Sequence, residues 1–222
     1  MDLQKKSVRQ RAVRSDSLKN RQLIIAALET SIKNGNTNPT MTEIAKEAGL
    51  APATAYRYFP TLDSLHRQFL LSVIEELDLQ TEELSGQGED LFRKKLRIWM
   101  KIVEEAGPAM VFVSSRFGFL DRLFSGEAHV KALEKVWGIP IKQILEEQSI
   151  DLQWYPIAFA LFNALINVRD ILDYKRSTDW SAEELEEFLA ATFIESVRSL
   201  GSLRSPGRTL PAKEDEAEFC NR

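Results

Sequence analysis

Residues 40–65 read TMTEIAKEAGLAPATAYRYFPTLDSL, and this stretch predicts two short helices joined by a tight turn. Thr40 has a glutamate three residues later, which is the spacing of a capping box at a helix start. Apolar residues then recur at intervals of three and four, which indicates one buried helix face. Gly49 ends this helix, and Pro52 suits the first turn of a second helix at about residues 52–59. A helix, a glycine-containing turn and a second helix form the helix-turn-helix unit.

The second helix divides into an inward and an outward face. Ala55 and Phe59 lie four residues apart and are expected to pack inward. The side chains expected to face outward are Ala53, Thr54, Tyr56, Arg57 and Tyr58. Tyrosine hydroxyls donate to phosphate, arginine binds guanine, and threonine offers a hydroxyl and a methyl group to base edges. The pattern therefore predicts a helix that enters the major groove of double-stranded DNA.

The rest of the chain also reads as helix. A helix is expected at about residues 18–33, with Leu23, Ala27 and Thr30 on one face and Ile24, Leu28 and Ile32 beside them. Pro60 ends the second helix of the motif, and Thr61 and Asp63 are expected to cap a longer one. Helices continue to about residue 200, with breaks expected at 85–88, 107–108, 125–126, 138–140 and 177–179. Because no segment alternates with period two, the predicted fold class is all-α.

Residues 41–65 resemble the DNA-binding signature of the TetR family of transcriptional regulators, and the resemblance covers about residues 18–70. It implies an N-terminal three-helix DNA-binding domain followed by a larger C-terminal helical domain for ligand binding and dimerisation. Thr40 and Thr42 would then touch phosphate or a base edge. The groove would be faced by Ala53, Thr54, Tyr56 and Arg57, and the DNA backbone would be touched by Tyr58. Many members carry a cation just after the position of Phe59, which Pro60-Thr61-Leu62 lacks here.

Charge supports an N-terminal DNA-binding region. Residues 1–72 hold 11 Lys and Arg and 6 Asp and Glu, a net +5, whereas the whole chain carries −4. A basic N-terminal third of the chain either binds the phosphates of DNA or owes its charge to a solvated tail. The expected domains are a disordered basic arm (1–15), a helix-turn-helix domain (16–72), a ligand-binding and dimerisation domain (73–203) and a disordered tail (204–222). The basic residues Arg9, Arg11, Arg14, Lys19 and Arg21 are hypothesised to replace the missing cation.

The second domain is rich in aromatic residues, which suits a small hydrophobic or aromatic effector. The candidate ligand-binding residues are Trp99, Phe112, Phe117, Phe124, Trp137, Asn163, Asn167 and Asp170. The last three share one face of an expected helix, where they either line a ligand cavity or form hydrogen bonds across a dimer. Arg116, Asp121 and Arg122 either gate a pocket or form surface ion pairs.

The final two strong helices are expected at about residues 153–174 and 181–200. The second has an apolar face that contains Leu185, Phe188, Leu189, Thr192, Phe193 and Val197. The resemblance implies a homodimer through these helices, although such a face could also complete a monomeric core. It further implies a repressor that a small hydrophobic effector releases from a palindromic operator.

Several classes of function find no support in the sequence. There is no glycine-rich phosphate loop and no nucleophile–base constellation, so an enzyme is not expected. Cys220 is the single cysteine, and with His66 and His129 it makes no metal-ligand pattern, so no metal or cofactor is expected. No secretory signal and no run of about 18 apolar residues is present, so a cytoplasmic protein without a membrane span is expected. An architectural DNA binder and a helical interaction module without DNA binding remain as alternatives.

Overall fold

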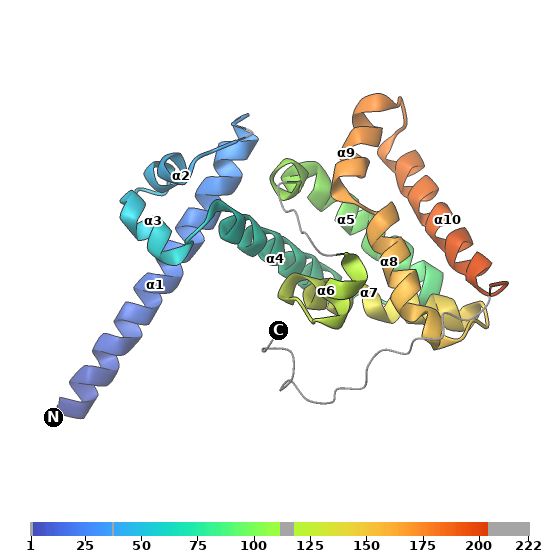
Figure 1. Cartoon of the computed structure of the whole chain (residues 1–222), viewed down its shortest axis with the longest axis horizontal. Coiled ribbons are helices and arrows are strands. Elements are labelled where there is room, and N and C mark those ends of the chain that lie inside the picture. The colour runs from blue at the N-terminus through green and yellow to red at the C-terminus, as the bar shows by residue number, and fades with distance from the viewer. Residues whose placement is uncertain (1, 37, 112–117, 204–222) are drawn as a thin grey trace. The chain divides into compact units, whose positions relative to one another are not determined.

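The computed structural model describes residues 2–36, 38–111 and 118–203, with side chains from residue 16 onward. Every regular element in these ranges is a helix, which confirms the all-α prediction (Figure 1). The chain forms two compact units. The first comprises Met1–Val73 and Ile102–Ser114, and the second comprises Ile74–Lys101 and Ser115–Arg222. The return of residues 102–114 to the first unit was not predicted from the sequence.

The first unit contains three N-terminal helices: α1 (Asp2–Lys33), α2 (Met41–Glu47) and α3 (Pro52–Tyr58). It also contains the start of α4 (Leu62–Thr81) and the end of α5 (Gly88–Met110). α1 packs against α2 and α3, and these two pack against each other. Their shared core includes the buried side chains Ile24, Leu28, Ile44, Ala55, Phe59 and Leu65.

The N-terminal residues differ from the sequence expectation. The backbone of residues 2–15 continues α1, where the low apolar content predicted a disordered arm. Half of the residues in this stretch are Lys, Arg or Gln, which have high helix propensity and so favour the extension of the helix. The expected tail at 204–222 lies outside the described residues.

The second unit contains the remaining helices around an aromatic core. They are α6 (Phe119–Phe124), α7 (Ala128–Glu147), the 3-10 turn η1 (Leu152–Trp154), α8 (Tyr155–Leu165), α9 (Val168–Ser177) and α10 (Ala182–Leu200). α8 contacts α6, α7 and α10, so it lies at the centre of this unit. In the core, the Phe92 ring lies 5.4 Å from that of Trp137 and 4.6 Å from that of Phe193.

Two expected breaks are absent. α5 continues through Pro108 and α7 through Pro140, so the predictions of breaks at 107–108 and 138–140 were wrong. A proline inside a helix removes a hydrogen bond and is costly. In α7 the buried side chains of Trp137 and Ile141 stand on both sides of Pro140. Burial of these side chains stabilises the helix more than the proline weakens it.

The single helix expected at 153–174 is divided into two helices. α8 ends at Leu165, and Asn167 begins α9 by accepting a hydrogen bond from the backbone N–H of Arg169 at 2.8 Å. By length and composition alone, residues 152–177 would suffice to cross a membrane, and 39% of their most apolar window is buried. The cap at Asn167 interrupts this segment. Ile157, Leu161, Leu165 and Leu172 in this segment are half-buried.

Candidate nucleic-acid interface

The start of α2 is held by the predicted capping box. The Thr40 backbone N–H donates to Glu43 Oε2 at 2.7 Å, and the Glu43 backbone N–H donates to Thr40 Oγ1 at 3.3 Å. The bond from the Thr40 backbone, and then the bond from its hydroxyl, lower the pKa of the Glu43 carboxyl. Thr40 and Thr42 are both exposed at this helix start.

The turn after α2 has a geometry that requires glycine. Gly49 has a φ of +68°, a conformation that side chains disfavour. The N–H of Leu50 donates to the carbonyl of Ala45 at 2.8 Å, and the N–H of Gly49 donates to that of Lys46 at 3.0 Å. These two bonds form a Schellman motif, which satisfies the last carbonyls of α2. The direction in which α3 leaves α2 is thereby fixed by backbone hydrogen bonds.

α3 is fastened by the two residues expected to face inward. Ala55 is fully buried and Phe59 is 1% exposed, which confirms that prediction. The guanidinium of Arg21 on α1 also lies over the Phe59 ring in a cation–π contact. Arg21 donates in turn to Gln68 Oε1 on α4 at 2.7 Å. The inner side of α3 is thus joined to the helices before and after it.

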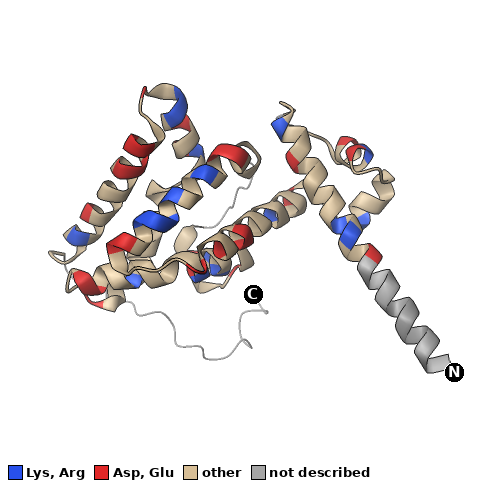
Figure 2. Cartoon of the chain, turned by 180° about the vertical axis from the view of Figure 1, so that it is seen from behind, with Lys and Arg blue, Asp and Glu red and all other residues tan. Residues whose placement is uncertain are grey.

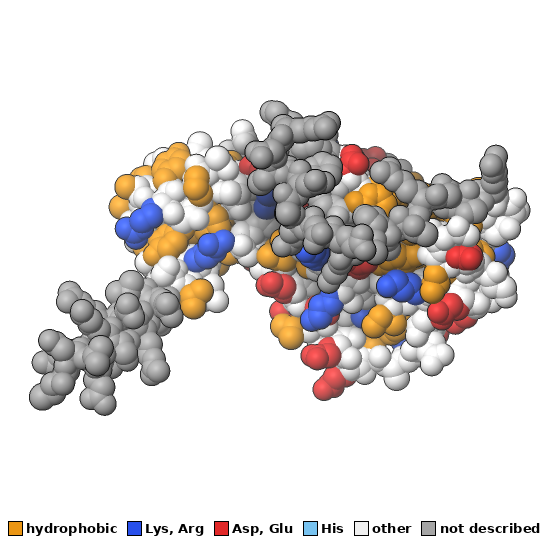
Figure 3. All heavy atoms as spheres, turned by 60° about the horizontal axis from the view of Figure 1, so that its bottom comes forward, with side chains coloured by type: hydrophobic (Ala, Val, Ile, Leu, Met, Phe, Trp, Pro, Cys, Tyr) orange, Lys and Arg blue, Asp and Glu red, His pale blue; other side chains and the backbone are white. Residues whose placement is uncertain are grey.

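The outer side of α3 carries the residues predicted to face DNA. Tyr56 is 48% exposed, Ala53 and Arg57 are exposed, and Thr54 and Tyr58 are half-buried. On the face drawn in Figure 3, this unit presents hydrophobic side chains next to basic ones. Figure 2 shows Lys and Arg on α1 close to α3. Exposed aromatic and basic groups on one short helix can meet bases and phosphates.

Tyr58 is oriented more firmly than Tyr56. Its hydroxyl accepts a hydrogen bond from Asn20 Nδ2 on α1 at 3.5 Å, and the Arg57 guanidinium carbon lies 5.3 Å from its ring centre. Hydrogen bonds from Asn20, then from Ser17 and Arg57, lower the pKa of Tyr58. A tyrosine held in this way can present its hydroxyl at a fixed place.

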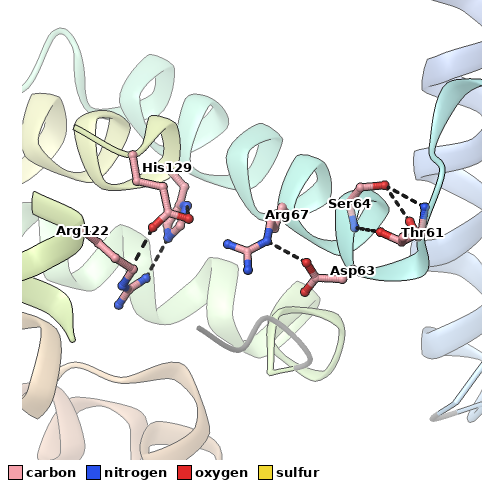
Figure 4. Close-up of polar contacts among 7 residues, drawn as sticks. Thr61, Asp63, Ser64, Arg67, Arg122 and His129 are labelled. Atoms are coloured by element: carbon pink, nitrogen blue, oxygen red, sulfur yellow. Dashed lines mark hydrogen bonds and ion pairs between the residues drawn. The ribbon is translucent and has the colours of Figure 1, made fainter. Parts of the chain in front are cut away.

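The start of α4 differs in part from the prediction. Thr61 caps the helix as expected, since its Oγ1 accepts from the Ser64 N–H at 3.1 Å and its own N–H donates to Ser64 Oγ at 3.3 Å (Figure 4). Asp63 was expected to help, but its carboxylate pairs with Arg67 Nε at 2.8 Å. Arg67 is a cation in the first two turns of α4 that sequence reasoning missed. Its signal was the four-residue spacing from Asp63.

The candidate ligand residues do not gather into one polar stripe. Trp99 and Trp137 are buried, and their indole N–H groups have no acceptor among the described residues. Asn167 caps α9 and Asp170 is exposed on it, so the expected common face with Asn163 is lost at the break. Asn163 and Phe124 are half-buried, whereas Phe112, Phe117 and Arg116 lie outside the described residues.

Arg122 belongs to a half-buried cluster rather than to a surface pair. Its Nη1 lies 2.9 Å from Nε2 of His129, which is 6% exposed, and its Nε lies 3.9 Å from a Glu127 oxygen (Figure 4). Asp121 is exposed. Sequence reasoning also missed Lys95, a buried lysine on α5. Its signal was a charge at helical spacing between the apolar residues Phe92 and Trp99.

Comparisons with known proteins agree with this geometry. The family model of bacterial regulatory proteins of the tetR family matches residues 23–68. The HTH-type transcriptional regulator BetI of Brucella anthropi is 34% identical over 74 residues, which are 33% of this chain and 38% of that protein. BetI of Agrobacterium fabrum is 36% identical over 62 residues, 28% of this chain and 30% of that protein. The match thus spans roughly a third of the length of these curated relatives.

Two solved structures are similar over most of the chain. The crystal structure of RolR in complex with its ligand resorcinol has a TM-score of 0.53 at 17% identity, and the match covers 86% of this chain and 97% of that one. A tetR-family transcriptional regulator from Streptomyces coelicolor has a TM-score of 0.53 at 19% identity, with 82% of each chain covered. At these identities the likeness concerns the fold.

Proposed function

This chain belongs to the TetR family of bacterial transcriptional regulators, and we propose that it binds a palindromic operator as a homodimer. A small hydrophobic effector would release it, so that it acts as a repressor. Its similar proteins are named as regulators, and we propose no enzymatic activity for it.

The exposure of Tyr56 carries the DNA-binding proposal. Nearly half of this side chain is exposed on α3, although the opposite side of the same helix is buried through Ala55 and Phe59. Tyr56 and the exposed Arg57 stand together on the outer side of a helix whose inner side is buried, and such a pair can contact phosphates and base edges. α3 would lie in the major groove with Ala53, Thr54, Tyr56 and Arg57 towards the bases.

Phosphate contacts would flank this helix. Thr40 and Thr42 stand exposed at the start of α2, where their side chains can reach phosphate oxygens. Tyr58 would donate its oriented hydroxyl to the DNA backbone. Arg67, partly exposed beside Asp63, supplies a basic group close to the position where Pro60-Thr61-Leu62 has none.

A second copy of the chain would cover the partly exposed apolar side chains of the second unit. Ile157, Leu161 and Leu165 on α8 are half-buried, and Phe188 on α10 is 38% exposed. A dimer would bury these side chains and place two α3 helices for two half-sites about one DNA turn apart. The expected dimer helices are therefore α8 and α10, the first being shorter than the sequence predicted.

The effector would act by favouring one of two arrangements. A ligand shifts such an equilibrium only if it binds one arrangement more tightly than the other. RolR, which shares the fold, is described with the aromatic ligand resorcinol. A planar ligand in the second unit would pack against aromatic rings such as those of Phe92 and Trp137.

Selection of bound sequences from random double-stranded DNA tests the proposal. We expect a palindromic site, retained in the presence of excess random DNA, because a specific regulator keeps a large ratio of specific to non-specific affinity. The double variant Tyr56→Ala with Arg57→Ala should lose this site while its circular dichroism is unchanged. Arg176→Ala, an exposed cation on α9, is the matched control and should bind as the unmodified protein does.

Two results would contradict the proposal. Binding without sequence preference would favour an architectural protein, and equal retention of the double variant and the control would favour an interaction module without DNA binding. The dimer is tested separately by sedimentation. Leu161→Glu should yield monomers, whereas Leu79→Glu, at a position that is 67% exposed, should leave the dimer intact.

A further inference from the structure

A lysine lies in the interior of the second unit without a carboxylate bonded to it. Lys95 on α5 is 8% exposed, and its ammonium donates to Thr81 Oγ1 on α4 at 3.0 Å. Burial lowers the pKa of Lys95, and the charge of Asp78 opposes this shift only in part; Asp78 is itself engaged by Lys135. An ammonium has three protons to donate, and Thr81 is its hydrogen-bond acceptor among the described residues. Two of those protons therefore remain for another group.

A second donor lies one helical turn further along the same helix. Trp99 is 4% exposed, and its indole Nε1–H has no acceptor among the described residues. Residues four apart lie on the same face of a helix, so the side chains of Lys95 and Trp99 leave α5 in the same direction. Buried donors without acceptors are rare, because each loses its bonds to water and gains nothing in exchange.

An aromatic side chain shares this face of α5. Phe92, three residues before Lys95 on the same face, is stacked on Phe193 at 4.6 Å and lies 5.4 Å from Trp137. The Trp137 indole N–H is likewise buried and without an acceptor among the described residues. A planar ring would find flat apolar partners here, and an acidic group attached to it would find the ammonium.

We propose that Lys95 and Trp99 form the acid-binding end of the effector site, and that the effector is a small aromatic carboxylate. This inference rests on the proposed function and specifies the chemistry of its ligand. A carboxylate has two oxygens with lone pairs for several hydrogen bonds, which matches two ammonium protons and one indole N–H. A neutral ligand would accept from the indole but would bring no negative charge to an ammonium whose neighbouring carboxylate, Asp78, is already paired with Lys135.

The experiment compares acids with their amides. Benzoate, 4-hydroxybenzoate and indole-3-acetate are each titrated into the full chain beside the corresponding carboxamide, with calorimetry as the readout. We expect at least one acid to bind about 10-fold or more tightly than its amide, since the amide lacks the charge that Lys95 requires. The proposal fails if none of the acids shows saturable binding up to about 10 mM, or if each amide binds as well as its acid.

Variants then assign the binding to this pair. Lys95→Met removes the charge and keeps an unbranched apolar side chain, and it should weaken acid binding about 30-fold or more. Trp99→Phe keeps the ring without its N–H and should weaken it about 5- to 10-fold. Lys94→Met is the matched control, because Lys94 is partly exposed and pairs with Asp90 on the surface. Equal binding by the Lys94 and Lys95 variants would overturn the proposal, as would unchanged binding by Trp99→Phe.

These measurements contain no DNA, so they stand apart from the test of DNA binding. Acid binding that depends on Lys95 would remain if no operator were found. If an operator is found but no acid binds, the proposal of a DNA-binding regulator stands and only the proposal of an aromatic carboxylate effector is contradicted.

Discussion

The guanidinium carbon of Arg21 lies 4.9 Å from the centre of the Phe59 ring, and this contact joins α1 to the end of α3. The same guanidinium donates to Gln68, which lies on α4. Three helices of the first unit therefore meet at one buried aromatic side chain. The orientation of the outward residues of α3 depends on this junction, because α3 is a short helix and cannot be stable by itself.

Truncation of Phe59 should destabilise the first unit more than removal of the Arg21 cation. Phe59→Ala is expected to lower the free energy of unfolding by about 3–5 kcal/mol, through lost burial and an internal cavity. Arg21→Met should cost about 1 kcal/mol, because it removes a cation–π contact but keeps most of the packed chain. Urea denaturation measures both. Leu79→Ala, at an exposed position, should change little, and a similar loss in all three variants would contradict the junction.

The capping box at α2 predicts a dependence of stability on pH. The folded-state pKa of Glu43 is lowered, so its contribution is complete above the unfolded-state pKa of about 4.3 and is lost as the pH falls through the folded-state value. The stability difference between the unmodified protein and Glu43→Gln should therefore shrink between about pH 5 and pH 3. Glu47→Gln, on the same helix but outside the cap, is the control. A difference that stays constant over this range would contradict the cap.

The fold of residues 40–59 could be predicted because its signals act over short distances. The box at Thr40, the glycine at 49 and the proline at 52 each determine backbone within about five residues, and the structure confirms all three. Contact between these residues and DNA stays a prediction. No such local signal selects the face of α1 that is buried.

The face of α1 and the interior of the second unit depended on tertiary contacts. Leu23 and Ile24 both fit the helical spacing of apolar residues in α1. Leu23 is nevertheless 39% exposed and Ile24 is fully buried, because α2 and α3 pack on the face of α1 that contains Ile24. Pro140 reads as a break until the burial on both sides of it is known. Asn167 reads as part of a polar stripe, although its short side chain begins a new helix. The buried position of Lys95 follows equally from packing, which spacing alone does not give.

The second unit contains a close approach that depends on the absence of a side chain. A Cβ on Gly138 in α7 would lie 2.9 Å from the hydroxyl of Tyr155 in α8. Tyr155 is 2% exposed and donates to Glu134 Oε1 at 3.0 Å. Burial, and then the charge of Glu134, raise the pKa of Tyr155, so the hydroxyl keeps its proton and acts as donor.

Gly138→Ala should therefore destabilise the protein, although alanine is otherwise the better helix residue. We expect a loss of about 1–3 kcal/mol from the displaced tyrosine. Tyr155→Phe removes the hydroxyl that would be struck, so the double variant should lose less than the sum of the two single variants. Thermal unfolding of all four proteins measures this coupling. Additive losses would show that the two residues do not meet.

The N-terminal extension of α1 should strengthen DNA binding through charge alone. Residues 2–15 contain Lys5, Lys6, Arg9, Arg11 and Arg14 and one acidic residue. Each phosphate neutralised by such a cation adds about 0.9 to the slope of log affinity against log salt. Deleting residues 2–15 should therefore weaken binding to the selected operator and reduce this slope. A variant with glutamine at the five basic positions keeps the length of the segment, and it should reproduce both effects if charge is the cause. Unchanged affinity and slope in both variants would mean that the extension does not meet DNA, and the operator would then be held by α2, α3 and the start of α4.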